Sequence, residues 1–156
     1  MPTTLIVCAN ASRARIFTQR SLKDPLEEIA DLVNPEARER AEAFMTDEST
    51  AQRSADKSRH SVGQATTGSD YQPHLTPHQV EAQKFAQEIA TFLDEAHNAG
   101  RFEKLCVMAS PEFLGVLRKK LSTRMGRVET TEVNKDYTRE SAQQLRERLV
   151  EMAKPH

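Results

Sequence analysis

Short apolar runs and longer amphipathic stretches alternate along this chain of 156 residues. Thr4–Ala9 and Lys104–Ala109 are compact runs of aliphatic and β-branched residues, a pattern typical of strands buried on both faces of a sheet. Residues 10–12 are turn-forming, and in Ala14–Gln19 the side chains of alternate residues would lie on opposite sides of a strand. This pattern predicts a hairpin with the run Thr4–Ala9. Val128–Val133 also alternates apolar residues and predicts a further strand.

The segment Leu26–Val33 fits two kinds of element. Its apolar positions follow a helical spacing as well as they follow a strand. Asp24-Pro25 and Asn34-Pro35 punctuate the segment on either side, so we favour a third antiparallel strand. Asparagine followed by proline is also a typical helix start, which predicts a short helix over Pro35–Phe44.

The strongest helix signal begins at Thr76. Thr76 and Gln79 have the spacing of a capping box, Pro77 suits the first helical position, and Gly100 is a natural stop. The apolar residues in between form one stripe at helical spacing: Ala82, Phe85, Ile89, Phe92, Leu93 and Ala96.

Two shorter helices are predicted further along the chain. Ser110-Pro111 opens the first of them, and Ser141 with Gln144 forms a capping box that opens the second. The residues expected to pack inward are Phe113, Leu114, Leu117 and Leu121 in the first helix, and Leu145, Leu149 and Met152 in the second.

The predicted order is three strands followed by helix, strand, helix, strand and helix. A strand meander followed by right-handed crossovers gives an α/β fold, with a mixed five-stranded sheet and helices on both faces. The length of 156 residues fits a single domain.

A long polar loop at about 45-76 interrupts this pattern. Hydrophobic residues make up 37% of the chain and the mean hydropathy is -0.67, and the apolar deficit falls mainly in Thr46–Thr76. Ordering a residue costs roughly 1–2 kcal/mol, which so polar a segment cannot offset by burying apolar surface. We therefore expect the loop to be mobile in the free protein.

Charge and cysteine content exclude several classes of protein. The 22 Lys and Arg residues oppose 23 Asp and Glu residues, so bulk charge does not hold the chain to nucleic acid, although a local basic patch stays open. Cys8 and Cys106 lie in apolar runs without metal-ligand spacing, so we expect buried, reduced thiols, no metal and no cofactor. The run Leu5–Ala9 is too short for a signal peptide or a membrane span, and we expect a cytoplasmic protein without membrane insertion.

Polar residues follow each of the predicted parallel strands. The carboxyl ends of such strands meet at one edge of the sheet, where ligands bind in open α/β folds. Asn10, Ser110, Lys135 and Asp136 reach this edge, and Arg13 joins them from the hairpin turn. With the free amides of the helix after Ser110, these groups suit a phosphate or a carboxylate. The same residue types also make ordinary turns and caps, so both interpretations stay open.

Three other groups are candidates for binding or chemistry. Arg59 and His60 lie in the polar loop, either as a phosphate contact and proton-transfer group or as solvated side chains. His74 and His78 have no cysteine or carboxylate cluster beside them, which does not favour zinc. The basic run at 118–120, which begins with Arg118, either contacts a phosphate backbone or forms a solvated helix face.

An ordered set of short motifs runs through the chain. After the strand run at 5–10 come Arg13-Ala14-Arg15-Ile16-Phe17 and Asn34-Pro35-Glu36-Ala37-Arg38. Further motifs are Arg59-His60, Phe85-Ala86, Leu114-Gly115-Val116-Leu117-Arg118 and Lys135-Asp136. Together, and in this order, they resemble the bacterial host attachment protein family over nearly the whole chain.

The resemblance implies a fold. The family is similar to the middle domain of archaeal and eukaryotic class I release factors, a ribonuclease H-like sheet with strand order 3-2-1-4-5. That order agrees with the pattern along the chain and places Cys8 and Cys106 in neighbouring strands. Asn10 stands where the family usually has aspartate, and an amide carries no charge for a divalent ion. The release-factor domain carries a Gly-Gly-Gln motif directly before its long helix. This chain has only Val62-Gly63-Gln64, which lies well upstream of Thr76.

Three functions stay open. The resemblance favours a non-enzymatic binding module that engages RNA or the ribosome through a release-factor-like sheet. The first alternative is a protein-interaction factor that is needed only indirectly for surface attachment. The second is a hydrolase that acts on a phosphate or ester bond through Arg59 and His60.

Overall fold

The computed structural model describes residues 2–37, 75–122 and 125–155. The polar loop, the candidate residues Arg59 and His60, and most of the helix predicted over Pro35–Phe44 lie outside this part of the chain. Only the start of that helix is described, at residues 35–37, where the Asn34 side chain accepts a hydrogen bond from the Glu36 amide. The predicted mobility of the polar loop and the predicted roles of Arg59 and His60 therefore stay predictions.

Five strands lie in one mixed sheet. They are β1 (Thr4–Ala9), β2 (Arg13–Gln19), β3 (Glu27–Val33), β4 (Lys104–Ala109) and β5 (Glu129–Val133), in the order β3-β2-β1-β4-β5. The first three pair antiparallel, whereas β1 pairs parallel with β4 and β4 pairs parallel with β5. The predicted fold class and strand order are confirmed, and the ambiguous third segment is a strand.

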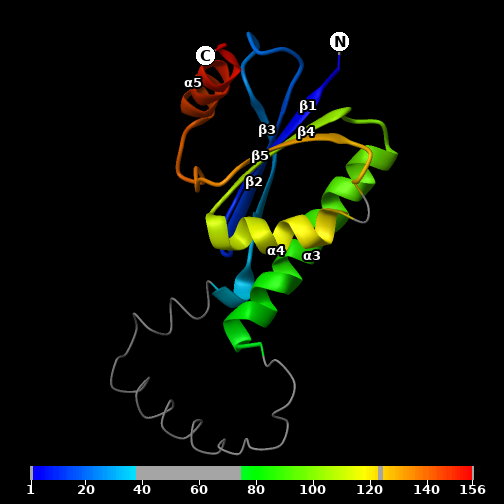
Figure 1. Cartoon of the computed structure of the whole chain (residues 1–156), viewed down its shortest axis with the longest axis vertical. Coiled ribbons are helices and arrows are strands. Elements are labelled where there is room, and N and C mark those ends of the chain that lie inside the picture. Colours follow the sequence, from blue (N-terminus) through cyan, green and yellow to red (C-terminus); the bar gives the residue numbers. More distant parts are fainter. Residues whose placement is uncertain (1, 38–74, 123–124, 156) are drawn as a thin grey trace, which may run out of the picture.

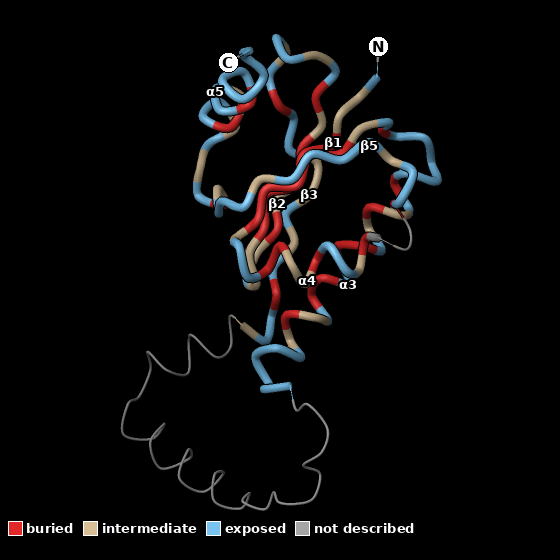
Figure 2. Tube along the Cα trace, in the orientation of Figure 1, coloured by how far each residue is buried: buried red, intermediate tan, exposed pale blue. Residues whose placement is uncertain are grey.

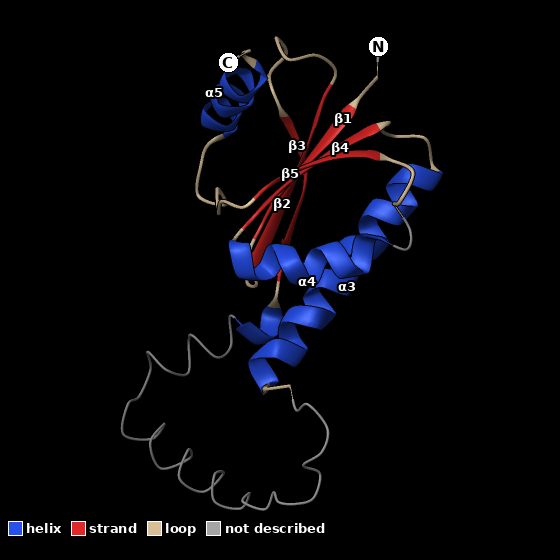
Figure 3. Cartoon of the chain, viewed as in Figure 1, coloured by secondary structure: helices blue, strands red, loops and turns tan. Residues whose placement is uncertain are grey.

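Helices cover both faces of this sheet, but unequally. Figure 1 and Figure 3 show α3 (Pro77–Asn98) and α4 (Pro111–Ser122) against one face and α5 (Ala142–Ala153) against the other. Successive side chains of a strand point to opposite faces. Leu5, Val7 and Ala9 of β1 accordingly join the core under α3 and α4, while Ile6 and Cys8 join the core under α5.

The predicted capping box of α3 is present. The Thr76 hydroxyl accepts from the Gln79 amide at 3.1 Å, and the Gln79 side chain accepts from the Thr76 amide at 2.8 Å. At the other end Gly100 has φ 72°, a conformation that L side chains rarely adopt, and the Arg101 amide donates to the Ala96 carbonyl. The expected apolar stripe of α3 is buried except for Phe92, which is partly buried.

One sequence prediction about burial is wrong. Met152 was expected to pack inward, but it is 40% exposed in the last turn of α5, and Figure 2 shows the C-terminal end of the chain as exposed. The strand predicted over Val128–Val133 is present as β5, and its residues Glu129, Thr130 and Thr131 are all exposed. β5 is an edge strand of the sheet, and charged or polar residues on an edge discourage pairing with another chain.

Candidate functional site

Asn10 connects two segments at the carboxyl edge of the parallel strands. Its side-chain amide donates to Asp136 Oδ2 at 2.9 Å and to Thr138 Oγ1 at 3.3 Å. Its side-chain carbonyl accepts from the amides of Ser12 and Arg13. The predicted meeting of residues after β1 and after β5 therefore occurs, and the contacts are those of a structural tie between the β1–β2 turn and the segment that leads to α5.

Asp136 is the charged partner in this tie. Partial burial acts to raise the pKa of its carboxyl group, but hydrogen bonds from Asn10 and Thr138 outweigh it and hold that pKa below its usual range. Both the amide and the hydroxyl of Thr138 donate to Asp136 Oδ1, at 3.0 Å and 2.7 Å. The carboxylate thus has three donors and stays ionised at neutral pH.

Two of the arginines predicted to bind a ligand, Arg13 and Arg118, are engaged by carboxylates of the chain itself. Arg13 makes two hydrogen bonds to Asp31 of β3, at 2.9 Å and 2.7 Å, and this contact lowers the pKa of Asp31. Arg118 likewise donates two hydrogen bonds to the carboxylate of Glu132 in β5, at 3.0 Å and 2.7 Å. Lys135 is exposed in the segment after β5. The structure thus brings Asn10 and Asp136 together but gives Arg13 and Arg118 partners on the edge strands.

A pocket lies beside this tie, on the face that α3 and α4 cover. Its volume is about 210 Å³, and it lies between the first turns of these helices and the β1–β2 turn. Ala11, Leu75, Ala82, Phe113 and Val116 supply its apolar lining. Its polar lining comes from His78, Gln79, Gln83, Ser110 and Glu112. Ser110, one of the predicted site residues, therefore faces this cavity.

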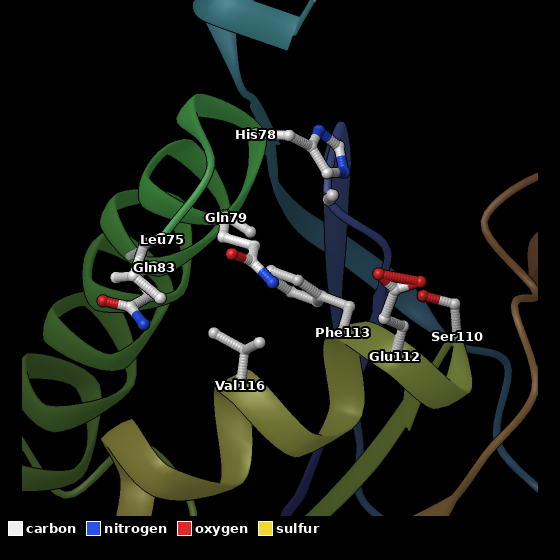
Figure 4. A pocket seen from close by; sticks show the side chains of 10 residues that line it. Leu75, His78, Gln79, Gln83, Ser110, Glu112, Phe113 and Val116 are labelled. Atoms are coloured by element: carbon white, nitrogen blue, oxygen red, sulfur yellow. The ribbon is translucent and has the colours of Figure 1, made fainter. Parts of the chain in front are cut away.

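The side chains around the pocket come from two helices (Figure 4). Gln79 reaches from α3 across the pocket toward Phe113, and Val116 points from α4 toward α3. Glu112 and Ser110 lie together at the start of α4. Sequence reasoning missed Glu112 and the two glutamines, because in the sequence they are ordinary polar residues in the first two turns of predicted helices.

The thiols of the chain lie away from the pocket. Cys8 and Cys106 are free and buried on the α5 face, in neighbouring strands as expected. Burial raises the pKa of Cys8 to about 12 and that of Cys106 to about 11, so neither is a thiolate at neutral pH. In the part of the chain that is described, no three His, Cys, Asp or Glu side chains are grouped to hold a metal ion.

Fold and pocket together define an α/β protein with a mixed five-stranded sheet and a ligand-sized cavity at the carboxyl edge of its parallel strands. A family model described as "Protein required for attachment to host cells" matches residues 5–149, and the chain belongs to this family. The resemblance to the family inferred from the motifs is thereby confirmed, whereas the likeness to release factors stays a prediction.

One curated relative is an uncharacterized protein of Rickettsia prowazekii (strain Madrid E). It is 27% identical to this chain over 74 residues, which are 46% of the chain and 49% of the relative. The match thus spans about half the length of that relative. None of the helices described here is both long and apolar enough to cross a membrane.

Proposed function

We propose that this chain is a non-catalytic binding module that serves attachment to host cells and takes its ligand in the pocket between α3 and α4. The observation that carries the proposal is the position of the cavity. It opens beside Ala11 and Ser110, directly after the carboxyl ends of the neighbouring parallel strands β1 and β4. Open α/β sheets bind ligands at this edge.

The lining supports binding. Phe113, Ala82 and Val116 offer apolar contact area, while a few polar groups converge from Gln79, Gln83 and Ser110. Such a mixture is typical of small-ligand pockets. At about 210 Å³ the cavity suits a compact molecule or a single side chain of a partner rather than a large cofactor. The hydrolase alternative rests on Arg59 and His60, outside the described residues, and stays a prediction.

A plugging variant tests the proposal. Val116→Trp fills the cavity from α4, and Val150→Trp is the matched control because Val150 is 36% exposed on α5, on the other face. We expect Val116→Trp to abolish amide shifts induced by small-molecule fragments at Ser110 and Phe113, and to reduce attachment of cells that carry it. Val150→Trp should leave both unchanged. Equal behaviour of the two variants would contradict the proposal.

RNA binding is the second candidate function, and a local basic segment favours it. Residues 113–128 contain five Arg and Lys residues and no acidic residue. Arg118, Lys119 and Lys120 line a groove along α4 with Gln83 of α3. Arg118 is paired with Glu132, and Lys119 also has an interaction partner. Arg127 is exposed and Lys120 is partly exposed, and these are the two cations that we expect to contact phosphates.

RNA binding is tested by the anisotropy of a labelled RNA oligonucleotide at several salt concentrations. The Lys120→Ala/Arg127→Ala variant should weaken binding and lower the salt slope by about two, one for each lost phosphate contact. The control is Arg139→Ala/Lys154→Ala, which removes two exposed cations away from α4. If the two double variants bind alike, or if wild type does not bind at low salt, this candidate function fails.

A further inference from the structure

The charges around the pocket differ from those expected at this edge. The sequence predicted an anion-binding site formed by Arg13, Lys135 and the backbone amides that follow Ser110. Arg13 is held by Asp31, and neither Arg13 nor Lys135 lines the cavity. Among the described residues that line the cavity there is no Lys or Arg, and the single carboxylate is that of Glu112.

The position of Glu112 is consistent with an ordinary role in α4. It lies in the first turn of the helix, where a carboxylate stabilises the positive end of the helix dipole. Among the described residues, Glu112 has no ion-pair partner. Glu132 and Glu140, by contrast, pair with arginines. Its carboxylate therefore stays available to a ligand at the mouth of the cavity.

We infer that this pocket is selective for a small organic cation, an ammonium or amidinium head on a short apolar body. The cation meets Glu112, and hydrogen-bond acceptors are within the same lining: the Ser110 hydroxyl and the side-chain carbonyl of Gln83. The apolar body lies against Phe113 and Val116. A phosphate or carboxylate ligand is disfavoured, because it would approach a like charge. This inference rests on the proposed function of the same pocket.

Three probes of similar size separate charge from shape. They are n-pentylammonium, 1-pentanol and pentanoate, each titrated while the amide shifts of Gln79, Ser110 and Val116 are followed. We expect affinity to fall in that order. Because Glu112 is exposed, we expect the ammonium to bind about fivefold more tightly than the alcohol.

The Glu112→Gln variant keeps the shape of the side chain and removes its charge. It should abolish the preference for n-pentylammonium over 1-pentanol and leave binding of the alcohol unchanged. Glu88→Gln, an exposed residue of α3 outside the lining, is the matched control and should keep the preference.

The outcomes distinguish this inference from the function on which it rests. Equal binding of ammonium and alcohol, tighter binding of pentanoate, or an unchanged preference in Glu112→Gln overturns the cation inference and leaves the pocket as a ligand site. If none of the three probes shifts the lining amides, the proposed function fails, and the inference fails with it.

Discussion

The face of the sheet under α3 and α4 and the face under α5 differ in how they are held. The first has a broad apolar core that reaches from Leu5 of β1 to Leu117 of α4. The second has a much smaller core around Leu145 and Leu149, supplemented by polar ties. A site on the first face has a rigid base, whereas α5 depends on a few hydrogen-bonded side chains to stay in place.

Arg15 is the central tie of the α5 face. Its guanidinium makes two hydrogen bonds to Glu28 and donates to the backbone carbonyls of Thr138 and Glu140. It also lies 5.0 Å from the centroid of the Phe17 ring. Charge-assisted hydrogen bonds to a loop fix its path but contribute less than burial of a large apolar area.

The largest expected effect comes from shortening a core side chain on each face. Leu117→Ala should lower the free energy of unfolding by about 4 kcal/mol, because Leu117 is fully buried in the larger core. Leu145→Ala should cost about 2 kcal/mol, since α5 can relax toward solvent. Urea denaturation measures both, with the exposed Leu22→Ala as control near zero. Equal costs would show that the faces are equally rigid.

Asn10→Asp tests the polar tie between the β1–β2 turn and the segment that leads to α5. The change puts a carboxylate against Asp136, with loss of the 2.9 Å hydrogen bond, and should cost about 2 kcal/mol at neutral pH. Like charges raise the pKa of the pair, so the loss should shrink as pH falls and a proton is shared. Asn10→Ala separates repulsion from the lost hydrogen bonds. An equal, pH-independent cost of both variants would refute the charge explanation.

Asp136 itself should leave a signature at acidic pH. Because its pKa in the folded protein lies below the unfolded value, its stabilisation is present above about pH 4 and is lost as pH falls through the folded pKa. Asp136→Asn should cost roughly 1 kcal/mol at neutral pH and flatten the acid side of the stability curve. Denaturation curves across this pH range check it, and an unchanged acid side in the variant would contradict the assignment.

The smallest effect is expected at the edge strands. Arg13→Ala removes the pair with Asp31, in which both side chains are more than 40% exposed, and should cost less than about 0.5 kcal/mol. Arg118→Ala should behave in the same way at the opposite edge. Thermal denaturation of each variant provides the check. A cost above 1 kcal/mol would mean that the edges contribute as much as the tie at Asn10.

Local sequence patterns sufficed for most of the fold. The capping boxes at Thr76 and Ser141 and the buried runs of β1 and β4 appear in the structure, and they depend on residues within one element. The strand order, which the family resemblance implied, is also present. The exposure of Met152 and of β5 depends instead on where the sheet ends, which no local pattern contains.

The candidate site was less accessible from sequence. Asn10, Ser110 and Asp136 were placed at the correct edge because residues after parallel strands must meet there. The pocket, however, combines residues near positions 11, 75–83 and 110–116, and their convergence follows from how α3 and α4 pack. Arg13 was assigned to a ligand because the ambiguity of β3 concealed its ion-pair partner Asp31 on that strand.

The parallel pairing of β1 with β4 has a consequence for biosynthesis. Thr4 pairs with Lys104 and Ala9 with Ala109, so each residue of β1 is 100 positions away in the sequence from its partner in β4. While the ribosome is still making the middle of the protein, β1 has only its hairpin partner β2, and its other edge has no β4 to pair with. Contacts between such distant segments form late and slowly. The nascent chain therefore exposes one edge of a highly apolar strand until α3 and β4 have emerged, and such exposed surface favours aggregation.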